Sequence, residues 1–212
     1  MHIHLDALGG MAGDMFAAAL LDAFPEHQDG VRASVRAVDA RIACALHPHN
    51  DGILSGARFS VSGPEVEPDH RHDHGHPHHD HPHGHHAHHD HGHAHGHAHG
   101  HGHRPWSEIR AALTGADLAP AVRAHALGIF GHLAEAEARV HGIAVEAVAF
   151  HEVGAFDSIA DIVAAAHLIA ALEARSWSVS ALPLGSGRVR TKHGPLPVPA
   201  PATTLLLDGF AT

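Results

Sequence analysis

Apolar residues in the first sixty positions follow strand spacing and helix spacing in turn. Residues 2–7 predict a short strand that runs into a glycine-rich turn at 9–14. Apolar positions at helical spacing then continue to Pro25, which ends the predicted helix. Residues 31–38 predict another short helix, and residues 42–46 and 53–61 predict two strands around a turn at 48–52. The expected order is therefore β-α-α-β-β.

The hydrophobic pattern stops at Gly63 and resumes at Trp106. Of the 30 histidines in the chain, 19 lie between His70 and His103. Residues 67–104 contain only three apolar side chains, all of them alanine, so this stretch cannot bury a core. We expect it to be a disordered, histidine-rich inserted loop.

Three helical patterns follow the loop. Ile109 and Leu113 mark the face of the first, residues 118–141 predict a long helix ended by Gly142, and residues 155–175 predict the third. Short strands are expected at 179–184 and 188–191, and a last helix near 200–207. The fold class is thus α/β, of mixed α+β type, with a small sheet packed against several helices. We expect residues 1–66 and 105–212 to be two halves of one composite domain, interrupted by the loop at 67–104.

Composition narrows the possible functions. The chain has 13 basic and 23 acidic side chains, a net charge of −10, and no tyrosine. These values argue against binding to nucleic acid or to an anionic membrane. The single cysteine, Cys44, permits no intrachain disulfide, and no segment of the sequence has the length of a membrane span. A cytoplasmic protein is expected.

The histidine-rich loop is the most specific chemical feature. Every second residue from 91 to 103 is a histidine, which places seven rings on one side of an extended chain. Imidazole nitrogen suits Ni²⁺, Cu²⁺, Zn²⁺ and Co²⁺ better than Mg²⁺ or Ca²⁺. We interpret the loop as a store or delivery device for such metals, the alternative being a tolerated low-complexity insertion. The predicted ligands are His91, His93, His95, His97, His99, His101 and His103.

A second candidate site is the glycine-rich turn between the first strand and the first helix. Backbone N–H groups at Gly10 and Gly13 and the positive end of the helix could bind a phosphate, and Asp6 and Asp14 could hold a divalent ion beside it. No Gly-Lys-Ser/Thr sequence follows, so the turn is not a Walker A motif. The alternative is a purely structural turn, with Asp14 favourable in the first helical turn.

A third candidate site precedes and begins the helix at 155–175. His151 and Glu152 are candidate proton carriers, and Asp157 and Asp161, four residues apart, share one helical face. The alternative is that Asp157 merely favours the helix N-terminus. A weaker motif is Gly185-Ser186-Gly187, in which Gly185 and Gly187 could approach a nucleotide closely or simply form a turn.

In this order the motifs resemble the nickel-insertion proteins that complete the nickel-pincer nucleotide cofactor, the pyridinium-3,5-bisthiocarboxylic acid mononucleotide nickel chelatases. The resemblance covers essentially the whole chain but only the N-terminal portion of such proteins. One departure is Ala149, where relatives often have a further histidine. The matching segments are Leu5-Asp6, Gly10–Met15, Ala136-Glu137, Val140–Gly142, His151–Ala155, Asp157–Ile159 with Asp161, Pro183–Gly187, His193-Gly194 and Pro197–Thr203.

The resemblance implies a lyase that inserts nickel into the pyridinium nucleotide, with CTP and Mg²⁺ or Mn²⁺, in a protein completed by a C-terminal region or a separate partner chain. It implies a homo-oligomer, and it implies a recipient enzyme such as a lactate racemase. His151 or Glu152 would take the ring proton that nickel replaces.

Two other functions agree with parts of the sequence. A non-enzymatic nickel metallochaperone or store would use the histidine-rich loop alone, although it leaves the Asp, Glu and His residues outside the loop unexplained. A divalent-metal phosphohydrolase would use Asp6, Asp14, Asp157 and Asp161, although it leaves the loop without a role.

Overall fold

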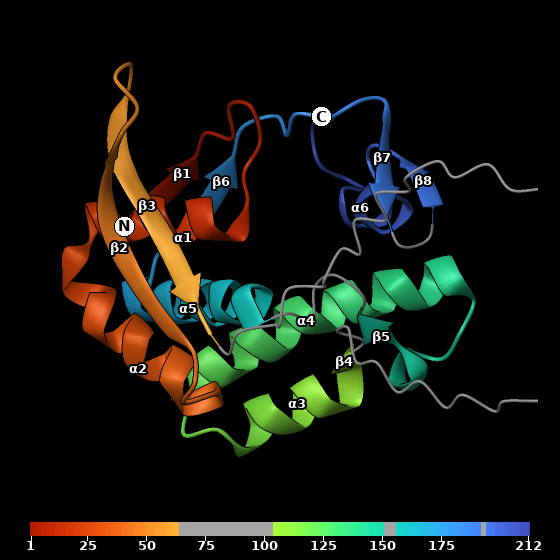
Figure 1. The fold of residues 1–212 in the computed structure, drawn as a ribbon, viewed down its shortest axis with the longest axis horizontal. Coiled ribbons are helices and arrows are strands. Elements are labelled where there is room, and N and C mark those ends of the chain that lie inside the picture. Colours follow the sequence, from red (N-terminus) through yellow and green to blue (C-terminus); the bar gives the residue numbers. More distant parts are fainter. Residues whose placement is uncertain (64–103, 151–155, 192–193) are drawn as a thin grey trace, which may run out of the picture. The chain divides into compact units, whose positions relative to one another are not determined.

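The computed structural model describes residues 1–63, 104–150, 156–191 and 194–212 (Figure 1). Apart from the histidine-rich segment, the chain forms one compact unit that spans residues 1–64 and 102–212. The elements in chain order are β1 (His2–Leu5), α1 (Gly13–Ala23), η1 (Pro25–His27), α2 (Gln28–Val38), β2 (Ala43–Asn50), β3 (Ser55–Ser62), β4 (Arg104–Pro105), α3 (Trp106–Gly115), α4 (Pro120–His141), η2 (Val145–Ala147), β5 (Ala149–Phe150), α5 (Phe156–Leu172), β6 (Ser176–Val179), β7 (Arg188–Thr191), β8 (Gly194–Pro197) and α6 (Pro201–Leu206).

The strands of the described residues pair two by two. β1 runs parallel to β6 and so joins the start of the chain to its last third, whereas β2–β3, β4–β5 and β7–β8 are antiparallel pairs. The mixed α/β class predicted from the sequence is confirmed, with strand pairing divided among these small sheets.

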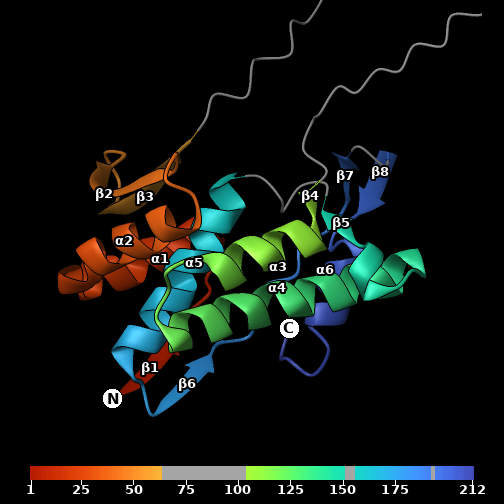
Figure 2. The ribbon, with the colours of Figure 1, turned by 90° about the horizontal axis from the view of Figure 1, so that it is seen from below.

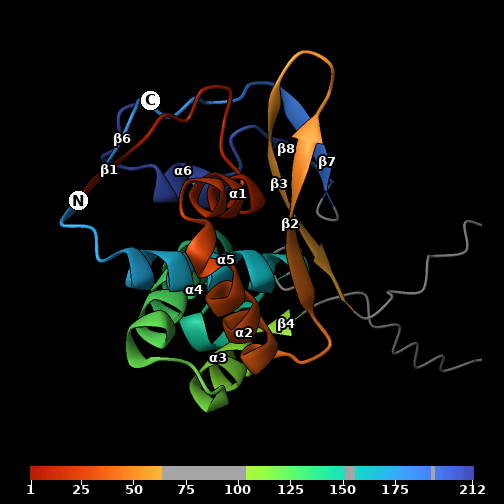
Figure 3. The same cartoon turned by 90° about the vertical axis from the view of Figure 1, so that its left-hand side faces the viewer.

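Helix α5 lies at the centre of the core and packs against α1, α2 and α4 (Figures 2 and 3). Ala160, Ala164 and Ala166 are fully buried on α5, and such small side chains let neighbouring helices approach closely. On α4 the buried face follows a four-residue repeat through Val122, Ala126, Phe130 and Ala134. Val140, an apolar residue near the end of the same helix, lies off this repeat, and its exposed fraction is 39%.

Two strand predictions also need correction. β6 ends at Val179 instead of extending over 179–184, because the chain beyond it bonds elsewhere: Leu182 N–H donates to Ala211 O over 2.8 Å. The predicted turn at 48–52 lies a few residues later, where the Asp51 carboxylate accepts the N–H groups of Ile53 and Leu54. Pro48 therefore sits inside β2, which it can do because a two-stranded sheet has only edge strands.

Among the described residues, every helix is too short or too polar to cross a bilayer.

Candidate functional site

The turn before α1 depends on glycine. Gly9 and Gly10 have φ angles of +75° and +108°, a region that side chains with a Cβ rarely adopt. The Gly10 N–H donates to Ala7 O over 3.1 Å and closes the turn. Helix α1 then starts at Gly13 without a side-chain cap from Ala12, and the Met15 N–H donates to Asp14 Oδ1 over 2.9 Å. The Gly10 N–H, one of the predicted phosphate donors, is thus used inside the turn, and phosphate binding at Gly13 stays a prediction.

Gly13 allows the start of α1 to touch α5. A Cβ built on Gly13 would lie 2.8 Å from Cβ of Asp161 and 3.1 Å from its Oδ2, closer than real contacts allow. The backbone N–H of Asp14 donates to the Asp161 carboxylate. The structure thus brings Gly13, Asp14 and Asp161, which the sequence assigned to two separate motifs, into direct contact.

Asp161 carries an unusual carboxylate. Burial, together with the negative charges of Asp14 and Asp157, raises its pKa from the usual 3.8 to about 6. Its Oδ1 atom is buried and lacks a hydrogen-bond partner among the described residues. A buried oxygen with excess negative charge around it attracts a proton or a cation.

The three aspartates Asp14, Asp157 and Asp161 form what we call the carboxylate cluster. Asp157 is exposed in the first turn of α5, where its Oδ1 accepts the Ser158 N–H over 2.7 Å. Within the part of the chain that the structure describes, no three His, Cys, Asp or Glu side chains are arranged as a ready metal site. Asp6 is exposed at the end of β1, and nothing in the described contacts joins it to the cluster. The cluster would therefore need a bound phosphate or water to complete the coordination of an ion.

Gly63, which follows β3, packs against the start of α5. A Cβ on Gly63, the last described residue before the histidine-rich segment, would lie 2.6 Å from Cδ2 of Phe156. Phe156 is the first described residue after 151–155 and is followed directly by Asp157. The end of β3 is thus held against the beginning of the helix that carries two of the three cluster residues.

The described chain resumes at Arg104, in a short antiparallel pair with the residues before 151. In the β4–β5 pair, Arg104 lies opposite Phe150 and Pro105 opposite Ala149. Phe130 of α4 fixes this pair, because its ring lies 6.1 Å from the Trp106 ring and 6.0 Å from the Phe150 ring. Phe150 immediately precedes His151. Gly63 and Arg104, the described residues on either side of 64–103, therefore contact Phe156 and Phe150, the described residues on either side of 151–155.

This arrangement of chain ends was missed at the sequence level. Glycine at position 63 and the aromatic residues at 106, 130, 150 and 156 are visible in the sequence, but nothing there pairs them. The predicted bases His151 and Glu152 and the predicted ligands from His91 to His103 lie outside the described residues, so their assignments stay predictions.

Gly185 and Gly187 make different contacts from the other predicted phosphate ligands. A Cβ on Gly185 would lie 2.6 Å from Cγ1 of Val198, and Gly187 O accepts the Val198 N–H over 3.1 Å. Gly187 also has a φ of +99°. These contacts give both glycines a structural reason, which was the alternative left open by the sequence.

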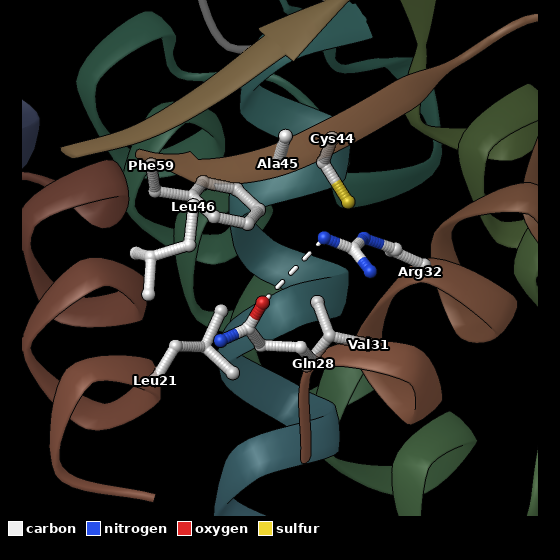
Figure 4. Close-up of a pocket in the computed structure, with 8 residues that line it drawn as sticks. All are labelled: Leu21, Gln28, Val31, Arg32, Cys44, Ala45, Leu46 and Phe59. Atoms are coloured by element: carbon white, nitrogen blue, oxygen red, sulfur yellow. Dashed lines mark hydrogen bonds between the residues drawn. The ribbon is translucent and has the colours of Figure 1, made fainter. Parts of the chain in front are cut away.

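A separate hollow lies between α1, α2 and the β2–β3 pair (Figure 4). It has almost no interior space and is lined mostly by apolar side chains such as Leu21, Val31 and Phe59. Typical ligand pockets start at about 300 Å³, so this hollow is too small for a nucleotide. Burial raises the pKa of the Cys44 thiol on its wall, which makes that thiol an inert packing residue.

Comparison with known proteins shows which family the chain is similar to. The model of the family described as "Nickel insertion protein" matches residues 3–212. A relative from Geobacter sulfurreducens, named for the same family, is 40% identical over 208 residues, which are 98% of this chain and 45% of the relative. A relative from Pelobacter propionicus is 38% identical over 211 residues, 99% of this chain and 45% of its own length. A relative from Thermomicrobium roseum is 51% identical over 104 residues, 49% of this chain and 26% of its own length. The chain thus spans about half the length of the first two relatives, and no solved structure matches it.

Proposed function

The chain belongs to the nickel insertion protein family, and from this premise we propose that it is the metal-handling portion of a nickel chelatase that acts on the pyridinium-3,5-bisthiocarboxylic acid mononucleotide. The observation that carries the proposal concerns described residues only: Gly63 packs against Phe156, and Arg104 pairs with Phe150. We propose that the histidine-rich segment supplies nickel to the residues that carry out the insertion.

The two kinds of donor have separate roles in this proposal. Histidine nitrogen suits Ni²⁺, which is the substrate metal, so the histidine-rich segment collects it. Carboxylate oxygen suits the harder Mg²⁺ or Mn²⁺, and the unpartnered Oδ1 of Asp161 fits such an ion. When bound with CTP, that ion neutralises phosphate charge. Asp14 and Asp157 complete the negative surface, and the positive end of α1 at Gly13 attracts the phosphate of the pyridinium nucleotide.

The chemical step replaces a hydrogen on the pyridinium ring by nickel. The electron pair of the C–H bond becomes the carbon–nickel bond, and the proton passes to His151 or Glu152. The two thiocarboxylates of the substrate supply the sulfur ligands. We propose further that the complete protein is a homo-oligomer that uses a C-terminal region or partner chain for CTP, and that it passes the finished cofactor to an enzyme such as a lactate racemase.

Insertion by the complete protein tests this proposal. The assay supplies the pyridinium nucleotide, Ni²⁺, Mg²⁺ and CTP, and follows formation of the nickel complex by mass spectrometry. We expect His151→Ala combined with Glu152→Ala to lower the rate by at least about 100-fold, the size of a general-base contribution, while nickel bound per chain stays unchanged. His132→Ala, which changes an exposed histidine of α4, is the matched control and should retain full activity.

Three outcomes would contradict this proposal, and two of them favour another function. Full activity in the double variant would remove the proposed base. Tight nickel binding without insertion by the complete protein would favour a metallochaperone or store. Hydrolysis of phosphate esters without nickel, abolished by Asp161→Asn, would instead favour a divalent-metal phosphohydrolase.

A further inference from the structure

The outer face of the β1–β6 pair is lined by histidine and serine side chains. His2 and His4 alternate with the buried Ile3 along β1, so both point to the exposed face. In the parallel register, His2 lies beside Ser176 and His4 beside Ser178. The inner face is closed by Trp177, whose ring stacks on Phe16 at 6.2 Å. The histidines therefore lie on a strand pair whose position is fixed by packing on its inner face.

The two imidazole rings converge on one atom. Nε2 of His2 lies 2.9 Å from Oγ of Ser178, and Nδ1 of His4 lies 2.8 Å from the same oxygen. Nδ1 of His2 is held by Ser176 Oγ at 2.8 Å, which fixes the plane of that ring. A serine hydroxyl has a single proton to donate, so at most one of the two nitrogens accepts it while the other must carry its own proton. Nε2 of His2 and Nδ1 of His4 thus both point toward the position of Ser178 Oγ.

We propose that His2 and His4 form a binding site for one borderline divalent transition-metal ion on the folded domain, separate from the histidine-rich segment and from the carboxylate cluster. A metal–nitrogen bond is about 2.0–2.1 Å, so a cation bound by both nitrogens requires that the Ser178 hydroxyl rotate away from its present position and that the two rings close inward. Water or the Ser178 hydroxyl fills the remaining positions. Ni²⁺, Zn²⁺ and Cu²⁺ are the ions that prefer imidazole nitrogen.

A second histidine pair in the same chain shows why spacing alone does not make such a site. His47 and His49 are also two residues apart on an exposed strand, β2 (Figure 3). Nε2 of His47 bonds to Ser60 Oγ at 3.0 Å, and the Ser60 hydroxyl donates to Ala45 O over 3.4 Å instead of joining the two histidines. Arg58 stands directly opposite His47, and its permanent positive charge opposes a bound cation. The pair on β2 is therefore a matched comparison for the pair on β1.

The test uses the full, isotope-labelled chain and Ni²⁺ alone, without nucleotide, so its result does not depend on insertion activity. Nickel is added beyond the capacity of the histidine-rich segment, and paramagnetic broadening of the backbone amide signals reports which parts of the fold lie near the metal. We expect the signals of Ile3 and of residues 176–179 to broaden. Either His2→Gln or His4→Gln should raise the nickel concentration for half-broadening by about tenfold or more, because two tethered ligands become one.

The double variant His47→Gln, His49→Gln is the control and should leave the response of β1 and β6 unchanged. Both histidines of β1 are exposed, and two independent single variants are available if one of them disturbs the fold. Sharp β1 and β6 signals at saturating nickel would overturn the proposal. Unchanged broadening in both single variants would overturn it as well.

Discussion

At the scale of single residues, the Asp161 carboxylate lowers the stability of the fold at neutral pH and is suited to bind a cation. Its carboxylate is half-buried, and burial and the charges of Asp14 and Asp157 hold its pKa at about 6, above the usual 3.8. Because folding favours the protonated form, the stability that this group contributes is fully present below pH 4 and is lost as the pH rises through about 6. At neutral pH the cluster therefore destabilises the unloaded fold, as is common for a site built to receive a cation.

The variant Asp161→Asn tests whether this carboxylate destabilises the fold at neutral pH. We expect it to raise the free energy of unfolding by about 1 kcal/mol at pH 7.5, a value reduced from the full pKa shift because half of the side chain is exposed, and to change it little at pH 4. Urea denaturation at both pH values measures the difference. Asp22→Asn, on an exposed position of α1, is the control. A variant less stable than the parent at pH 7.5 would mean that the carboxylate is held by favourable partners.

The sequence predicted the members of the carboxylate cluster but not how they meet. The i and i+4 spacing of Asp157 and Asp161 placed both on one helical face, and the glycine-rich turn indicated Asp14. Their contact depends on the missing side chain of Gly13, which lets two elements far apart in sequence approach each other. The His2 and His4 pair could have been recognised from alternation along a strand, but the serines opposite them become visible only through the register with β6.

At the scale of elements, a close contact links α2 to α5. A Cβ on Gly30 would lie 2.5 Å from Nε2 of His167, and Nδ1 of the same ring bonds to Ser34 Oγ at 2.8 Å. Burial, with the nearby His27, lowers the pKa of His167, so the ring is neutral at physiological pH. Gly30 thus has a packing reason to stand inside a helix, where glycine is otherwise unfavourable.

Alanine substitutions distinguish this glycine from the glycines of α4. Gly128→Ala meets no atom within 4 Å and should raise the free energy of unfolding by about 0.5–1 kcal/mol through helix propensity. Gly30→Ala should lower it by about 1 kcal/mol, because the His167 ring must move and lose its bond to Ser34. In a His167→Ala background the same change should become neutral or favourable. Chemical denaturation of the four variants measures these values, and equal gains at positions 30 and 128 would contradict the contact.

Helices were the elements that the sequence predicted best. The helical periods that end at Pro25 and at Gly142 correspond to α1 and α4, because each carries an apolar repeat and a clear stop. The two-residue strands β4 and β5 were missed, because two residues cannot show a period and their pairing is fixed by Phe130 from a third element. The same limit explains the misplaced end of β6, where hydrogen bonds to distant residues decide the boundary.

At the scale of the whole molecule, we expect the fold to be independent of the histidine-rich segment. Gly63 packs on Phe156, and Arg104 and Pro105 pair with β5, so each end is fixed by its own contacts. Aromatic packing between Trp106 and Phe130 also holds the chain directly after Arg104 and Pro105 in place. None of these residues belongs to 70–103, which contains 19 histidines and almost no apolar surface.

Deletion of residues 70–103 should therefore separate nickel capacity from stability. We expect the midpoint of thermal unfolding of the metal-free protein to change by no more than about 2 °C, because the removed residues bury little and both flanking contacts remain. Nickel bound per chain at pH 7.5, measured by equilibrium dialysis, should fall to a small remainder.

The undeleted chain at pH 5 is the control: it should also lose most of its nickel, since imidazole, with a pKa near 6.5, must be neutral to bind metal. A large fall in the unfolding midpoint would show that the segment packs on the domain, and full nickel binding at pH 5 would assign the metal to carboxylates instead of histidines.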